Sequence, residues 1–142
     1  IIGDGEMKTD LVNLVKNLKM QKKIIFLGHI KNPYKFIKNS LCVIVTSLWE
    51  DPGFVMIESS AMKKIVICSD CPNGPKEFFK NGKNGFLFKN NSEKSLYHTF
   101  DKFMSTSKSQ KLKFLKKNFK TSMSFSDLEH SKRFNSILNE KK

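Results

Sequence analysis

The sequence predicts an α/β fold: a doubly wound parallel sheet with helices on both faces, followed by further helices. Three short apolar runs, at residues 24–27, 41–45 and 65–68, are rich in β-branched side chains and bounded by polar or turn residues. Such runs are typical of parallel strands that are covered on both faces. Apolar residues at helical spacing lie between the runs, as in residues 11–18. Strands that alternate with helices indicate βαβ units.

Turn residues place the remaining elements. The opening IIGDGEMK should supply the end of a strand and the start of the first helix, and Pro33 should begin a short helix. A loop over residues 69–75 should lead into a short helix through Phe79. The segment KNGKNGFLF then predicts a turn followed by an edge strand, because its glycines permit unusual backbone angles.

The carboxyl-terminal third of the chain is expected to be helical. From Ser92 onward the spacing of apolar residues is helical, with a break near residues 122–126. A chain of 142 residues suits one domain with a sizeable core. We therefore expect one domain over residues 1–120, with its first strand truncated, and a helical tail over residues 121–142.

The formal net charge of +13 is large for this length and favours contact with phosphates, nucleic acid or anionic lipid. The lysines are scattered, so a generally lysine-rich composition is the simpler explanation. In residues 108–120, KSQKLKFLKKNFK, one face carries Leu112, Leu115 and Phe119, and lysines surround the rest. This segment could lie on an anionic membrane surface, but a helix packed on a sheet with a solvated outer face is favoured.

Two short features, a Gly-Asp-Gly motif and a lone histidine, are weak signals of a bound cofactor or ligand. Gly3-Asp4-Gly5 precedes a helix, but Lys8 replaces the third glycine of the dinucleotide fingerprint and no acid follows about 20 residues on. A nicotinamide cofactor is therefore disfavoured, and Gly5 either permits a tight turn or lets a ligand approach the backbone. His29 follows a predicted strand, where ligands gather in open α/β sheets, although a surface or packing role is ordinary for a lone histidine.

Cysteine usage points to a reducing compartment and not to a metal site. The three cysteines leave an odd one. Cys68 and Cys71 have the C-x-x-C spacing, but Cys68 ends a predicted buried strand and no second pair could complete a zinc site. We expect Cys68 in the core and no bound metal.

The stretch WEDPGFVMIESSA, residues 49–61, places Glu50 and Glu58 on either side of an Asp-Pro-Gly turn. A helix is predicted from Phe54, and its first amides lack partners within the helix. Such a helix start at the carboxyl edge of a parallel sheet can bind a phosphate. Two carboxylates so close to a phosphate should repel it, unless they accept hydrogen bonds from hydroxyls of the same ligand. A diphosphate that lies between a ribose and a sugar has such hydroxyls on both sides. Alternatively, Glu58 only complements the helix dipole and Glu50 is solvated.

Residues 47–88, SLWEDPGFVMIESSAMKKIVICSDCPNGPKEFFKNGKNGFLF, resemble the donor-binding signature of retaining, family-four type glycosyltransferases with the GT-B fold (glycosyl transferases group 1). In that family an E-x(7)-E motif precedes a strand, a glycine-containing loop with an acid, and a glycine before an apolar edge. Glu50 and Glu58 match the two acids, and residues 66–70 match the strand and its end. The remaining landmarks are matched by Gly74, Glu77 and Gly85. IIGDG and IIFLGHI resemble the preceding strands, so the likeness covers roughly residues 1–90.

The resemblance implies that the chain is the Rossmann-like, donor-binding half of a GT-B fold, without the amino-terminal acceptor domain. It implies that Glu50 is catalytic and contacts hydroxyls of the donor sugar near the reacting carbon. It also implies that Glu58 binds the nucleotide ribose. The backbone at Gly53, Phe54 and Val55 would hold the distal phosphate and the sugar.

The resemblance further implies that His29 and Ile30 lie against the base, and Gly5 completes the expected donor-binding set. These enzymes typically transfer a sugar from a nucleotide-diphosphate donor to an acceptor hydroxyl, with retention and without a metal or other cofactor. A hexosyltransferase is therefore expected, and its isolated donor-binding half should turn over poorly.

The expected partners are a nucleotide-sugar and a glycan or lipid-linked acceptor, as in polysaccharide or lipopolysaccharide biosynthesis. The expected location is the cytoplasm, with the inner face of the membrane and its anionic lipids as an option, and no nucleic acid is expected. The alternative is a non-catalytic basic α/β module that binds nucleic acid or an anionic membrane surface.

Overall fold

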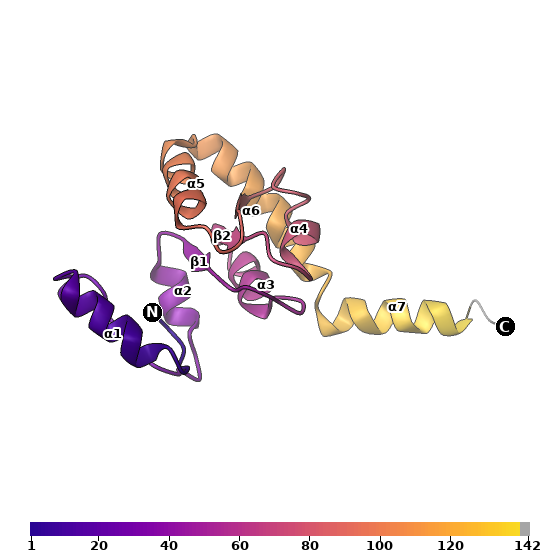
Figure 1. The fold of residues 1–142 in the computed structure, drawn as a ribbon. Helices are drawn as coiled ribbons and strands as arrows, with labels where there is room; N and C mark the ends of the chain where they lie inside the picture. The colour runs from indigo at the N-terminus through magenta and orange to yellow at the C-terminus, as the bar shows by residue number, and fades with distance from the viewer. Residues whose placement is uncertain (140–142) are drawn as a thin grey trace. The chain divides into compact units, whose positions relative to one another are not determined.

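The computed structural model describes residues 1–139 and divides into two compact units, residues 1–36 and the chain from residue 37 onward. Seven helices and three strands are described, and Figure 1 shows them in chain order. The helices are α1 (Lys8–Asn17), α2 (Tyr34–Asn39), α3 (Phe54–Ala61), α4 (Pro75–Phe78), α5 (Glu93–Ser105), α6 (Lys108–Met123) and α7 (Asp127–Asn139). The strands are β1 (Val43–Val45), β2 (Val66–Ser69) and β3 (Phe86–Phe88).

The first unit contains α1 but no strand, so the strand predicted at residues 24–27 is wrong, as is the strand end predicted before the first helix. Main-chain bonds do join this segment to the start of the chain. The Ile1 amino group donates to the Ile25 carbonyl oxygen at 2.6 Å, and the Leu27 N–H donates to the Ile1 oxygen at 2.9 Å. The Gly3 N–H also donates to the Gly28 carbonyl oxygen at 2.8 Å, but these bonds do not form a regular ladder, and Ile25 is 65% exposed instead of covered.

The second unit is built on a parallel sheet in the order β1-β2-β3. Val43 of β1 lies opposite Val66, and Ile67 of β2 lies opposite Phe86, so β2 is central and every one of its residues is buried. The edge position predicted for the last strand is confirmed. The strand predicted at residues 41–45 is shorter than expected, because only Val43–Val45 pair with β2.

Both faces of the sheet are covered, as predicted. Along β2, Val66 and Cys68 face one apolar cluster, to which α3 contributes Met56 and Ile57 and the α4 region contributes Phe78 and Phe79. Ile67 faces the second cluster, in which Phe103 of α5 and Phe114 of α6 pack edge-to-face on Phe86 with ring centroids 5.5 Å apart. The alternation of side chains along a strand explains how one short strand serves both clusters.

The carboxyl-terminal helices follow the prediction with one difference. The break predicted near residues 122–126 is confirmed between α6 and α7, but a second break, at Thr106 and Ser107, was not expected. There the Ser107 hydroxyl oxygen accepts the Gln110 N–H at 3.3 Å and so caps α6. Phe114 and Leu115 pack on the core, as expected for a helix with a solvated outer face, while Leu112 remains exposed. Within residues 1–139, no helix combines the length and apolar character needed to cross a bilayer.

Candidate functional site

The first turn of α3 leaves two main-chain amides without partners. Gly53 precedes the helix with φ +91°, a left-handed conformation that glycine adopts without steric cost. No side chain caps the helix, and the Met56 N–H donates to the Gly53 carbonyl oxygen at 3.0 Å. The N–H groups of Phe54 and Val55 find no hydrogen-bond acceptor among residues 1–139, and these residues are 65% and 49% exposed. Both amides lie at the positive end of the helix dipole, so this end suits an anionic group.

Glu50 holds a carboxylate beside the same helix start. Its N–H donates to the Pro72 carbonyl oxygen at 3.3 Å, which joins the loop before α3 to the loop after β2. A Cβ built on Gly53 would lie 3.6 Å from Glu50 Oε2, so the carboxylate lies directly against the helix cap. Glu50 is half-buried and therefore still open to solvent on one side.

Glu58 stands one turn further along the helix that begins at Phe54. Residues four apart share a helix face, so Glu58 lies on the face of Phe54, and side chains on a helix lean toward its amino-terminal end. The opposite face carries Met56 and Ile57 into the core. Glu58 is half-buried, and its carboxylate pairs with none of the residues that the structure describes. The helix that begins with the two free amides thus also carries an unpaired carboxylate, one turn further along.

Gly74 fixes the position of the loop that carries Glu50. It has φ +130°, and a Cβ at this position would overlap the carbonyl oxygen of Pro52. The Gly74 N–H donates to Glu77 Oε2 at 3.1 Å, which holds this turn in place. The family resemblance matched Gly74 and Glu77 only as landmarks, whereas the close approach of the Pro52 backbone gives the physical reason for a glycine at position 74.

The C-x-x-C pair is part of the core. Cys68 and Cys71 are fully buried free thiols, which confirms the core position expected for Cys68. Burial, with smaller contributions from Cys71 and Glu50, raises the pKa of the Cys68 thiol from its ordinary 9.0 to about 12. Cys68 is therefore protonated at neutral pH and lacks the reactive thiolate of a redox site. In the part of the chain that the structure describes, no three His, Cys, Asp or Glu residues cluster closely enough to hold a metal ion.

Three predicted site residues, Gly5, His29 and Ile30, belong to the first unit. The Gly5 N–H donates to Asp4 Oδ1 at 3.1 Å, and Lys8 Nζ bonds Asp4 Oδ2 at 3.0 Å. This bond to Lys8 is the main cause that lowers the pKa of Asp4, and the charge of His29 adds a smaller effect. His29 is exposed and Ile30 is half-buried.

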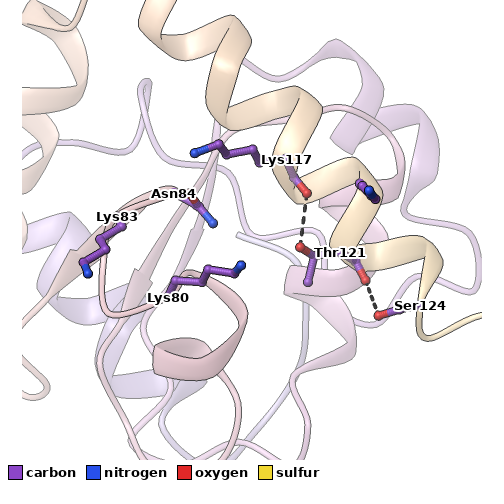
Figure 2. A pocket seen from close by; sticks show the side chains of 7 residues that line it. Lys80, Lys83, Asn84, Lys117, Thr121 and Ser124 are labelled. Carbon is purple, nitrogen blue, oxygen red and sulfur yellow. Dashed lines mark hydrogen bonds between the residues drawn. The ribbon is translucent and has the colours of Figure 1, made fainter.

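The structure thus brings together five of the eight predicted residues within the second unit. These five are Glu50, Gly53, Phe54, Val55 and Glu58, and they are called the α3 start below. Sequence reasoning missed a pocket lined by lysines between the loop after α4 and the end of α6 (Figure 2). Its lysines are far apart in the sequence and belong to no motif, so no local pattern could have identified them.

Comparison with known proteins gives one family. The family model described as glycosyl transferases group 1 matches residues 1–121. An uncharacterized glycosyltransferase of Methanocaldococcus jannaschii is 43% identical over 77 residues, which cover 54% of this chain and 19% of that protein. A second relative, from Campylobacter jejuni, is 33% identical over 97 residues, 68% of this chain and 27% of the relative. It is named N-acetylgalactosamine-N,N'-diacetylbacillosaminyl-diphospho-undecaprenol 4-alpha-N-acetylgalactosaminyltransferase.

Among solved structures, Anabaena HepE in complex with UDP aligns with a TM-score of 0.80 and 20% identity, covering 98% of this chain and 40% of that one. This similarity bears on the fold alone, and it agrees with a Rossmann-like half of a GT-B structure. The present chain spans between 19% and 27% of the length of the two relatives named above.

Proposed function

Because this chain belongs to the glycosyl transferases group 1 family, we propose that it is the donor-binding half of an enzyme that transfers a sugar from a nucleotide diphosphate, with retention, to an acceptor hydroxyl. One observation carries the proposal beyond family membership. The uncapped amides of Phe54 and Val55 begin a helix that carries Glu58 one turn further along, and the Glu50 carboxylate lies against the cap of the same helix. A diphosphate flanked by two hydroxyl-bearing groups is the ligand that satisfies all of these groups at once.

In this proposal the two amides bind the diphosphate, which becomes the leaving group. The bond from the anomeric carbon to the diphosphate oxygen breaks, and a bond from the same carbon to the acceptor oxygen forms on the same face. The proton of the acceptor hydroxyl passes to the departing nucleoside diphosphate. Fixed amides at the end of a helix stabilise the negative charge that grows on the diphosphate without any rearrangement, which lowers the barrier. No metal or other cofactor is needed for this role.

The two acids would have different roles. Glu50 would accept hydrogen bonds from the donor sugar and favour the positive charge that develops at the reacting carbon in a glycosyl transition state. Glu58 would accept hydrogen bonds from the ribose hydroxyls of the nucleotide and so contribute to binding in the ground state. For Gly5, His29 and Ile30, which belong to the first unit, a role in donor binding remains a prediction from the sequence.

The acceptor would be a glycan or a lipid-linked glycan, held by chain beyond these 142 residues. The name of the Campylobacter relative describes an acceptor carried on diphospho-undecaprenol, which makes this class of acceptor the first to try. We accordingly propose a cytoplasmic enzyme that works at the inner face of the membrane in glycan biosynthesis.

Calorimetric titration of the 142-residue chain with uridine and guanosine diphosphates tests the proposal. We expect saturable binding, weakened about tenfold or more by Glu58→Ala, because hydrogen bonds to a charged group are lost. Asp101→Ala is the matched control, since it removes an exposed carboxylate on α5 and should leave binding unchanged. In the full-length enzyme, Glu50→Gln should lower kcat far more than it raises KM.

The alternative, a basic module without catalysis, predicts another result. Such a module would bind duplex DNA or anionic vesicles at least as well as the nucleotide, with a steep loss of affinity as salt rises. If Glu58→Ala and Asp101→Ala bind nucleotide equally well, or if duplex DNA outcompetes it, the assignment of a donor site to the α3 start is wrong.

A further inference from the structure

Between the loop after α4 and the last turns of α6 lies a pocket of about 510 Å³, within the range of about 300–1,000 Å³ that small-molecule sites occupy. Four lysines line it, Lys80, Lys83, Lys117 and Lys120, together with Asn84, Thr121 and Ser124. This pocket is called the lysine pocket below. None of its lining residues belongs to the α3 start.

The first two lysines are held together by a tight turn. The Lys83 N–H donates to the Lys80 carbonyl oxygen at 3.2 Å, which closes a four-residue turn. The two central residues, Asn81 and Gly82, have φ +53° and +80°, as a type I′ turn requires, and Asn-Gly is the preferred pair for that turn. Lys80 and Lys83 are therefore the two ends of one turn, with α-carbons less than about 7 Å apart.

The other two lysines come from α6. Lys117 and Lys120 are three residues apart and so share one face of the helix. On the same wall, the Thr121 hydroxyl donates to the Lys117 carbonyl oxygen at 3.1 Å, and the Ser124 hydroxyl donates to the Thr121 carbonyl oxygen at 2.7 Å (Figure 2). The donors of these hydroxyls are thus occupied, and the ammonium groups remain the principal donors of this wall.

No acidic side chain in the pocket lining balances the positive charge of the four ammonium groups. The pocket lining contains no Asp or Glu, and none of the four lysines forms an ion pair with another residue in the part of the chain described. The carboxyl end of α6 carries a partial negative charge of about half a unit, which offsets only a fraction of four positive charges. Like charges gathered in one pocket repel one another, so a bound anion would stabilise this arrangement.

Asn84 adds a donor that is already in place. It is only 4% exposed, yet it lines the pocket, and its side-chain amide forms no hydrogen bond with any of residues 1–139. Its main chain is fixed, because the Asn118 amide donates to the Asn84 carbonyl oxygen at 2.9 Å in a buried position. In Figure 2 the Asn84 side chain lies between those of Lys80 and Lys117. Its amide is not one of the buried polar atoms that lack a partner, so it opens onto the pocket and is available to donate to a ligand there.

From these observations we propose that the lysine pocket binds a phosphate group, with Asn84 and the four lysines as its donors. Asn84 supplies a neutral, preplaced donor at the base of the pocket, and the mobile lysine stems supply charge from both walls. The group can belong to a free phosphorylated compound or to the headgroup of an acidic lipid, since both present the same oxygens. This inference does not depend on the donor site proposed at the α3 start.

The test follows side-chain amide signals of the 142-residue chain by NMR during titration with inorganic phosphate, with pyrophosphate, and with vesicles. The vesicles contain phosphatidylcholine either alone or with phosphatidic acid. One variant combines Lys80→Gln, Lys83→Gln, Lys117→Gln and Lys120→Gln. The matched control combines Lys102→Gln, Lys108→Gln, Lys113→Gln and Lys116→Gln, which removes the same charge from exposed positions on α5 and α6. Circular dichroism confirms that both variants are folded.

We expect phosphate or pyrophosphate to shift the Asn84 side-chain signals, with affinity reduced about tenfold or more in the pocket variant and less than about threefold in the control. Asn84→Ala should also weaken binding while leaving all four charges in place. Binding of the free ions identifies a soluble ligand. If the free ions do not bind, but the chain sediments with the vesicles that contain phosphatidic acid and not with those of phosphatidylcholine alone, the ligand is a lipid headgroup. Equal losses in the two lysine variants would show attraction by net charge and overturn the proposal, as would no shift at Asn84 with any probe.

Discussion

The α3 start and the lysine pocket lie in the same unit, and both offer donors to an anion, but they do so with different groups. At the α3 start the donors are main-chain amides of Phe54 and Val55, fixed by the helix, and the neighbouring side chains are acidic. In the lysine pocket most donors are ammonium groups on flexible stems, and no acid lines the pocket. If anions bind at both places as proposed, net charge is a poor guide to such sites, because the α3 start offers fixed dipoles among acidic side chains.

The two regions also differ in how tightly their glycines are packed. Replacing these glycines should give the largest of the effects predicted here. Gly74, beneath the α3 start, has no room for a Cβ, whereas Gly82 in the pocket turn has none of the protein within 4 Å of that position. Gly74→Ala should lower the free energy of unfolding by about 2–4 kcal/mol, because it adds a backbone clash to an unfavourable φ. Gly82→Ala should cost only about 1 kcal/mol. Urea unfolding measures both, and equal losses would contradict the packing difference.

A second prediction concerns the dry core below the α3 start. The pKa of Cys68 rises from 9.0 to about 12 on folding, so between these values the unfolded chain loses a proton that the folded chain keeps. Stability should therefore fall as the pH rises above 9.0, by about 1.4 kcal/mol per pH unit from this group.

Cys68→Ala should remove this part of the fall in the free energy of unfolding at alkaline pH, however much the substitution destabilises the protein at neutral pH. The comparison is made by urea unfolding of both proteins between pH 8 and about 10, below the main titration of the lysines. Parallel curves for the wild type and the variant would show that Cys68 ionises freely, and the core below the α3 start would then be wetter than the structure indicates.

The smallest expected effect is a difference between the two regions in how strongly salt weakens anion binding. A roughly tenfold rise in sodium chloride should weaken phosphate binding in the lysine pocket by about tenfold, because its charges are exposed and screened. Nucleoside diphosphate binding at the α3 start should fall by no more than about threefold, because its donors are fixed neutral groups. Calorimetry gives the second affinity and the Asn84 NMR signals give the first. Identical salt dependence would remove the distinction between the regions.

The sheet and the α3 start were predictable because the relevant signals are local. Apolar runs without alternation identified β1 and β2, and an Asp-Pro-Gly turn identified where α3 begins. The apolar run at residues 24–27 looked the same but formed no strand, since a strand depends on regular pairing with a neighbouring segment and not only on its own residues.

The lysine pocket could not be predicted for a related reason. Lysine and arginine account for 26 residues, so the four that converge cannot be distinguished from the rest by position in the sequence. The break at Thr106 and Ser107 brings α6 back over the sheet and thus sets where Lys117 and Lys120 lie, and this break was itself missed. The amide of Asn84 becomes informative only once its place in the pocket lining and its lack of a protein partner are known.

The main-chain amides of Phe54 and Val55 also affect which substitutions this protein can tolerate during evolution. Nearly every amino acid carries the same N–H, so exchanges at these two positions would retain the hydrogen bonds and alter only the surrounding shape. Under the proposed function, residues around the α3 start could therefore vary and change which sugar is bound, while the main-chain donors to phosphate are retained with the fold. Positions 80, 83, 117 and 120 have no such protection, because there every replacement except arginine removes the positive charge.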